Sequence, residues 1–230
     1  MVARPPVKEA QSTIIRLDVL PKATRNAFSL LQNFSFLSKS DWYLAGGTAL
    51  TLQIGHRKSV DLDFFTTQKT FHESEIEKEF LSTGKWITTL QQKGTLYGKF
   101  VNAKISFIAY PFFQPSKEKI FCGHISILAP HDIAAMKIVA ISQRGRKRDF
   151  VDLYWYCTHF DRLEEVIRRT IRQYPHQKLS IPHIIKSFTY FEDAEADPMP
   201  KIFFDVTWKK IKEYFQKEAV RLAKELLRLT

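Results

Sequence analysis

Two aspartates separated by one residue, Asp61 and Asp63, are the side chains of this sequence best suited to chemistry. They lie in the segment 60–65, where apolar residues at alternate positions predict a β-strand. Residues two apart on a strand project from the same face, so the two carboxylates should repel each other unless a cation lies between them. Mg²⁺ or Mn²⁺ prefers such oxygen ligands and completes its coordination with substrate phosphates. We therefore predict a metal site, although the spacing alone also fits a solvated strand face with two surface acids.

A glycine pair just upstream is suited to bind the phosphates that such a metal accompanies. Gly46 and Gly47 fall between a predicted strand, 42–45, and a helix that Thr48 would cap and Gly55 would end. Glycines let backbone N–H groups approach an anion closely, and a helix N-terminus carries a partial positive charge. A helix cap followed by a basic loop is the alternative interpretation. This segment predicts that a nucleoside triphosphate is bound by Gly46, Gly47, Thr48, Arg57 and Ser59.

A lysine in the second half of the chain is a further candidate for phosphate binding. Asp132 is expected to cap the helix that carries Lys137. The stem of Lys137 would be packed, and its ammonium would point into a cleft and bind the triphosphate as a point charge. A lysine at the protein surface is the alternative.

A basic cluster and two acids follow along the chain. Within residues 144–148, Arg146 and Arg148 would receive the phosphates of a nucleotide or of RNA, or would lie in a solvated loop. Asp149 and Asp152 are three apart on a predicted helix and share one side of it. We expect Asp149 to assist the attacking hydroxyl or the metal, and Asp152 to be structural.

Hydrophobic periodicity indicates the elements that must position these side chains. Strands are predicted at 42–45, 60–65, 88–92, 96–100, 104–110 and 124–128. Helices are predicted at 22–36, 48–54 and 73–81, then from residue 130 onward, including about 161–173, 180–189 and 205–228. The fold class is therefore α+β: a mostly antiparallel or mixed sheet with flanking helices over residues 1–129, followed by a helical domain, 130–230, that completes the active-site cleft.

In these motifs the sequence resembles a known family. Segments 44–50 and 57–65 are similar to the first motif of the AbiEii/AbiGii toxin family of nucleotidyltransferases, which belongs to the DNA polymerase β-like nucleotidyltransferase superfamily. Asp132 and Lys137 match the second motif, in which the acid is more often glutamate. The last motif is matched by Arg146, Arg148, Asp149, Asp152 and Leu153.

The resemblance implies a nucleotidyltransferase-type fold and metal-dependent transfer of a nucleoside monophosphate from an NTP to a hydroxyl group. It also implies the toxin of a toxin–antitoxin (abortive infection) pair, with an RNA such as tRNA as acceptor and an antitoxin protein encoded nearby. The catalytic residues would be Asp61, Asp63, Lys137 and Asp149, and Asp61 and Asp63 would hold the metal.

One departure from the superfamily pattern concerns a third carboxylate on a later strand. The corresponding position here reads Ile105-Ser106-Phe107, so a serine stands where an acid is usual. This weakens the case for a symmetric two-metal site. It leaves open a catalytically inactive nucleotide- or RNA-binding protein of the same fold. A nucleotidyltransferase acting on a small molecule, as antibiotic-modifying enzymes do, is a third hypothesis.

The composition fits a globular protein with polyanionic partners. The 230 residues are 44% hydrophobic and 26% charged, and the formal net charge of +11 favours phosphate-rich ligands. No apolar run approaches the roughly 20 residues of a membrane span, so no membrane contact is expected. The N-terminus lacks the apolar core of a signal peptide, and Cys122 and Cys157 are expected to be reduced thiols. We therefore expect a cytoplasmic protein.

Overall fold

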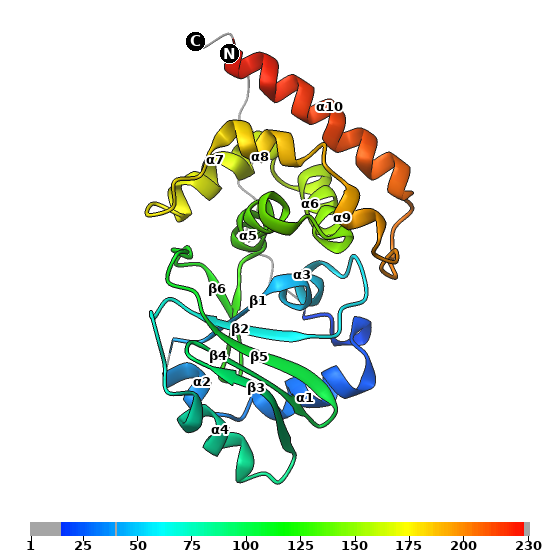
Figure 1. The fold of residues 1–230 in the computed structure, drawn as a ribbon. Helices are drawn as coiled ribbons and strands as arrows, with labels where there is room; N and C mark the ends of the chain where they lie inside the picture. Colours follow the sequence, from blue (N-terminus) through cyan, green and yellow to red (C-terminus); the bar gives the residue numbers. More distant parts are fainter. Residues whose placement is uncertain (1–14, 40, 228–230) are drawn as a thin grey trace, which may run out of the picture.

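The computed structural model describes residues 15–39 and 41–227, and its centre is one mixed seven-stranded sheet (Figure 1). The strand order is β3-β4-β5-β2-β1-β7-β6. Strands β2 and β5 are parallel, as are β1 and β7, and all other neighbouring pairs are antiparallel. The strands are β1 (Tyr43–Ala45), β2 (Leu62–Thr66), β3 (Trp86–Gln92), β4 (Thr95–Phe100), β5 (Ala103–Ala109), β6 (Lys119–Cys122) and β7 (Ile125–Leu128).

One face of the sheet is covered by helices that come from the first part of the chain. They are α1 (Lys22–Leu31), α2 (Phe36–Lys39) and α4 (Glu73–Leu81), and a 3₁₀ turn, Leu17–Val19, precedes them (Figure 1). Aromatic rings fill the layer between these helices and the sheet: the ring of Phe80 lies 4.4 Å from that of Trp86 and 5.2 Å from that of Phe100, measured between centroids. The opposite face of the sheet is therefore the one left for a site.

Six helices form the second half of the described chain. They are α5 (Pro130–Arg144), α6 (Lys147–His159), α7 (Leu163–Gln173), α8 (Ile181–Ser187), α9 (Glu192–Glu195) and α10 (Trp208–Leu227), gathered on one side of the sheet in Figure 1. Two hydrophobic clusters result, and α5 contributes Ile133 to the first and Ile138 to the second. The boundary at residue 130 stays a prediction, because α5 belongs to both clusters. The predicted α+β class, with a mixed sheet and a helical C-terminal region, is confirmed.

Three local predictions are wrong, and one strand was not predicted. Helix α3 (Gly46–Ile54) begins before Thr48, whose hydroxyl is buried and donates to Ser59 rather than capping the helix. Helix α5 begins at Pro130, so Asp132 lies inside the first turn and accepts hydrogen bonds from Ser116 and Gln173 instead. The predicted helix 22–36 is interrupted between α1 and α2, and the short edge strand β6 was not predicted.

Among the residues that the structure describes, no helix is both long and apolar enough to cross a membrane.

Candidate active site

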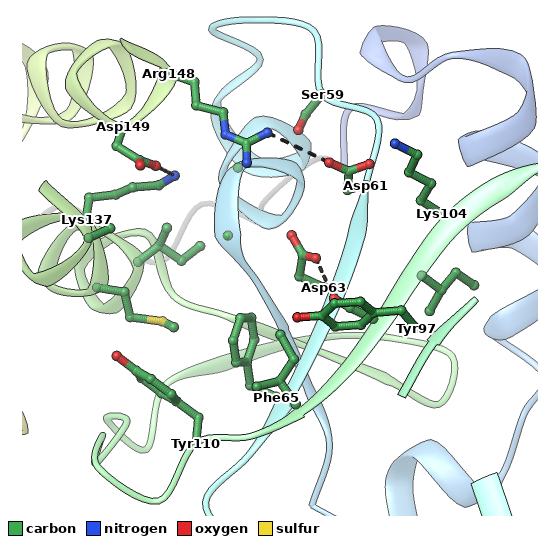
Figure 2. Close-up of a pocket in the computed structure, with 18 of the residues that line it drawn as sticks. Ser59, Asp61, Asp63, Phe65, Tyr97, Lys104, Tyr110, Lys137, Arg148 and Asp149 are labelled. Atoms are coloured by element: carbon green, nitrogen blue, oxygen red, sulfur yellow. Dashed lines mark hydrogen bonds and ion pairs between the residues drawn. The ribbon is translucent and has the colours of Figure 1, made fainter. Parts of the chain in front are cut away.

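A cleft of about 740 Å³ lies between the open face of the sheet and helices α5 and α6 (Figure 2). Its volume is in the range of small-molecule sites. Charged side chains from both halves of the chain line it, and basic ones outnumber acidic ones: Arg57, Lys99, Lys104, Lys137, Arg144, Arg148, Asp61, Asp63 and Asp149. The cleft is therefore chemically suited to an anionic ligand.

The two aspartates lie at the start of β2, in the middle of the sheet. Asp63 is paired in register with Ser106 of the parallel strand β5, and the Ser106 hydroxyl donates to Asp63 Oδ1 at 2.5 Å (Figure 2). Asp61 directly precedes the strand, and its Oδ2 lies 3.8 Å from Arg148 Nη1. The other oxygen of Asp61 is buried and has no hydrogen-bond partner among the described residues. The position of the missing third acid is thus occupied by a serine that contacts the second one.

The electrostatic environment of Asp63 disfavours its negative charge. Burial raises the pKa of Asp63 above its ordinary value, the hydrogen bond from Ser106 lowers it, and the nearby charge of Asp61 raises it again. A cation between the two carboxylates would offset both the burial of the Asp63 charge and its repulsion from Asp61. In the described part of the chain no cluster of three or more His, Cys, Asp or Glu side chains is placed to hold a metal. The two carboxylates on one face of the cleft fit a Mg²⁺ or Mn²⁺ ion that takes its other ligands from phosphate and water.

Two glycines form the floor of the cleft next to these acids. Gly46 has a φ of +71°, and a Cβ there would lie 3.1 Å from Asp63 Oδ2. A Cβ at Gly47 would overlap the guanidinium of Arg57. The first turn of α3 begins at Gly46 and is not capped by a side chain, so its N–H groups are available to an anion. Thr48 lies behind this floor and holds Ser59 at the cleft wall, with 2.8 Å between the two hydroxyl oxygens.

A buried ion network anchored on Asp152 supports the cleft from behind. Arg57 donates to both oxygens of Asp152, from Nε at 2.5 Å and from Nη2 at 2.9 Å. The Lys137 ammonium lies 2.8 Å from Asp152 Oδ2 and 2.6 Å from Asp149 Oδ1. His56 Nε2 lies 2.7 Å from Asp152 Oδ1, so this buried histidine belongs to the same network. Asp152 is structural in the sense that we predicted, since it connects three elements of the site.

The charges of this network balance. Burial alone would lower the pKa of Lys137, but Asp149 and Asp152 raise it above the ordinary value. Burial alone would raise the pKa of Asp152, but Arg57 and Lys137 hold it well below the ordinary value. The dominant effect on His56 is burial, which lowers its pKa. The network therefore contains two cations, two carboxylates and a neutral imidazole.

The predicted phosphate-binding side chains reach the cleft to different extents. Arg148 and Ser59 line it, and Lys137 keeps one of its three N–H donors beyond the two ion pairs. Arg57 also lines it, but each of its three guanidinium nitrogens already donates one hydrogen bond, to Asp152 or to the Lys58 carbonyl. Arg146 is paired with Asp197 and is not among the lining residues. The nucleotide-binding roles of these residues stay predictions.

Several lining residues were not predicted. Strands β4 and β5 contribute Tyr97, Lys99 and Lys104, and the far end of the cleft contains Phe65, Ile108, Tyr110 and Met136. The alternation within each strand indicates which residues share a face. Which strands are neighbours is fixed by the sheet order, and the sequence did not reveal that order.

The fold of this chain is shared with solved structures of nucleotidyltransferases. It aligns with the crystal structure of a Helicobacter pylori protein assigned to that class, with a TM-score of 0.52 and 16% identity, over 91% of this chain and 99% of that one. It also aligns with MenT4, a nucleotidyltransferase toxin of Mycobacterium tuberculosis H37Rv, with a TM-score of 0.52 and 16% identity, over 86% of this chain and 84% of that one. At this identity the likeness establishes the fold alone.

Sequence comparison narrows the class to one family. Residues 29–222 match the family model described as nucleotidyl transferase AbiEii toxin, type IV toxin–antitoxin system. An uncharacterized protein of Aquifex aeolicus (strain VF5) is 38% identical over 185 residues, which cover 78% of this chain and 86% of that relative. The chain therefore belongs to the AbiEii family of nucleotidyltransferase toxins, and an antitoxin is implied. The predicted family and enzyme class are confirmed.

Proposed function

We propose that the protein transfers a nucleoside monophosphate from an NTP to a hydroxyl group of RNA, with Mg²⁺ or Mn²⁺ held by Asp61 and Asp63. The supporting observation is the pair of carboxylates at the glycine floor, where Asp63 is buried with a raised pKa and one oxygen of Asp61 has no partner among the described residues. The metal, when bound, would neutralise phosphate charge and stabilise the negative charge that develops on the reacting oxygens.

The remaining residues would position the triphosphate. The uncapped first turn of α3, at Gly46 and Gly47, would donate backbone N–H groups to phosphate oxygens, and Ser59 would add its hydroxyl. Arg148 and the free N–H of Lys137 would neutralise charge from the helical side of the cleft. The attacking hydroxyl oxygen would form a bond to the α-phosphorus while its proton passes to Asp149, whose Oδ2 has no partner among the described residues, and the bond to pyrophosphate would break. Catalysis would then consist mainly of positioning and charge neutralisation.

The apolar end of the cleft would accept the nucleobase. Phe65 and Tyr110 lie in an edge-to-face arrangement with ring centroids 5.7 Å apart (Figure 2), and Ile108 and Met136 complete this end. A flat aromatic base gains dispersion energy against such side chains without needing sequence-specific hydrogen bonds. The same cleft would thus hold the base at one end and the phosphates at the other.

A transfer assay tests the proposal. Each α-labelled NTP is incubated with the protein, Mg²⁺ and total RNA, and the label is followed into RNA. We expect transfer from at least one NTP, and Asp61→Asn should reduce it at least about a hundredfold because the metal loses a ligand. The exposed Asp18→Asn change is the control and should leave transfer unchanged. Nucleotide binding without any transfer would instead support the inactive binder that Ser106 suggests.

The identity of the acceptor is read from the same reaction. Ribonuclease should release the label from the high-molecular-weight product if RNA is the acceptor. Label that appears in a small, ribonuclease-resistant product would support the alternative of a small-molecule nucleotidyltransferase.

A further inference from the structure

On the open face of β3, β4 and β5, side chains that are paired by register form a row across the strands, and this row leads to the two aspartates. By register, Ile87 of β3 is opposite Lys99 of β4, and Lys99 is opposite Lys104 of β5. Leu62 pairs with Ile105, so Asp61 is level with Lys104 on the neighbouring strand. Figure 2 shows the Lys104 side chain beside Asp61.

The lysine pair in this row is unfavourable for the protein alone. Residues directly opposite each other in an antiparallel ladder have Cβ atoms about 5 Å apart, and like charges at that distance destabilise the sheet. Lys99 and Lys104 are both exposed, both line the cleft, and neither forms an ion pair within residues 15–39 and 41–227. A phosphate between the two ammonium groups would turn this repulsion into attraction.

A second row, parallel to the first, adds an exposed aromatic ring. Tyr97 is opposite Ser106, which is itself level with Asp63. The Tyr97 side chain is 37% exposed, and Ile87 at the sheet edge is 66% exposed. Exposed aromatic and basic side chains on a sheet face are what single-stranded nucleic acids use, because bases stack on rings while phosphates contact cations.

We infer that this face of β3, β4 and β5 binds the acceptor RNA as a single strand, with phosphate on Lys99 and Lys104 and a base against Tyr97. The inference deepens the proposed function and rests on it, since a hydroxyl donor must reach Asp61 and Asp63. A strand lying along the two rows brings its end to these carboxylates. The NTP approaches from the opposite side, where α5 and the glycine floor lie.

Binding without NTP or metal tests the surface separately from the chemistry. Anisotropy of a labelled single-stranded oligoribonucleotide of mixed sequence is measured for the double variant Lys99→Gln/Lys104→Gln. We expect affinity to fall about tenfold, and the slope of log affinity against log salt to become shallower by about 1.4, for two lost phosphate contacts. The matched control is Lys39→Gln/Lys78→Gln, which removes the same charge from α2 and α4 on the covered face and should bind as the unchanged protein does.

The aromatic contact has its own pair of variants. Tyr97→Ala should weaken oligoribonucleotide binding about tenfold, whereas Tyr97→Phe should retain it because stacking needs the ring and not the hydroxyl. In the transfer assay, both Lys99→Gln/Lys104→Gln and Tyr97→Ala should raise the KM for RNA while leaving the KM for NTP unchanged.

The outcomes separate the inference from the proposed function. RNA affinity equal to that of the control, for both the lysine variant and Tyr97→Ala, overturns the inference even if transfer occurs. If these variants lose binding to a protein while their RNA affinity stays intact, the inference is also overturned, and this face is a protein-binding one. Absence of transfer from any NTP, with the predicted losses of RNA affinity, would refute the proposed reaction and leave the RNA-binding face in place.

Discussion

Asp152→Asn should destabilise the protein strongly although it changes only a few atoms. Asp152 is fully buried and accepts hydrogen bonds from Arg57, and its charge also holds Lys137. The amide would leave two buried cations facing a single carboxylate, Asp149. Removing one partner from a buried ion pair costs about 3–5 kcal/mol. For a chain of this size that lowers the melting midpoint by roughly 6–20 °C.

A matched control exists at the surface. Asp18 also accepts two hydrogen bonds from one arginine, from Arg16 Nε and Nη2 at 3.1 Å each, but both side chains are largely exposed. Asp18→Asn should leave the midpoint unchanged within error, because water already solvates that pair. Thermal and urea unfolding of both variants therefore isolate the effect of burial from that of the bidentate geometry.

Charge balance gives a stricter check of the same reasoning. Adding Lys137→Met to Asp152→Asn returns the network to one cation, Arg57, and one carboxylate, Asp149. The double variant should therefore regain part of the stability that Asp152→Asn loses, although it removes a further ion pair. If the stability losses of Asp152→Asn and Lys137→Met simply add, or if Asp152→Asn unfolds at the wild-type midpoint, the electrostatic account of this network is wrong.

The pH dependence follows from the sign of the shift at Asp152. Its pKa is lower in the folded protein than in the unfolded chain, so its contribution is present above the unfolded value and lost as pH falls toward the folded one. The stability difference between the wild type and Asp152→Asn should persist from pH 7 to about pH 4 and close only in stronger acid.

Three further variants test the metal-binding end of the cleft. Asp63→Asn should abolish transfer yet raise stability at neutral pH, because the raised pKa of Asp63 means that its ionisation costs folding free energy. The gain in stability should vanish below the pKa of aspartate in the unfolded chain, and unfolding measured as a function of pH checks the gain and its loss. Ser106→Ala removes the hydrogen bond that lowers the pKa of Asp63, so the acid limb of the activity–pH profile should move to higher pH; an unmoved limb would contradict the role assigned to Asp63. Gly47→Ala should reduce transfer by at least about tenfold, since its methyl group overlaps the Arg57 guanidinium, and wild-type kinetics would show that the floor can yield.

The elements that position the candidate site follow closely from local sequence patterns. Helix α4 has the predicted bounds, 73–81, and Gly55 adopts the left-handed conformation (φ +66°) that ends α3 as expected. Strand β2 begins two residues later and ends one residue later than predicted, but Asp61 and Asp63 both face the cleft as expected. Such features depend on periodicity and on glycine conformation, which neighbouring residues determine.

Features that depend on long-range packing were not accessible from the sequence. Arg57 and Asp152 are separated by 95 positions, so the sequence indicated two charged residues but not that each neutralises the other. Thr48 and Asp132 had the residue types of helix caps, but their helices begin earlier, and buried partners use their side chains instead. For polar residues, the sequence therefore showed which side chains could form hydrogen bonds or ion pairs, but not which groups they would contact.

Buried carboxylate oxygens that lack a hydrogen-bond partner among the described residues indicate where a ligand would bind. Buried cations behind the cleft are matched by carboxylates, as Arg57 and Lys137 are by Asp152. Among buried side-chain atoms without a partner in the described residues, the two that belong to charged groups are Asp61 Oδ1 and Asp149 Oδ2, and both residues line the cleft. A buried polar atom without a hydrogen bond costs stability unless a ligand supplies its partner. NTP and Mg²⁺ together should therefore raise the free energy of unfolding by more than the sum of their separate effects. Asp61→Asn should eliminate this additional stabilisation.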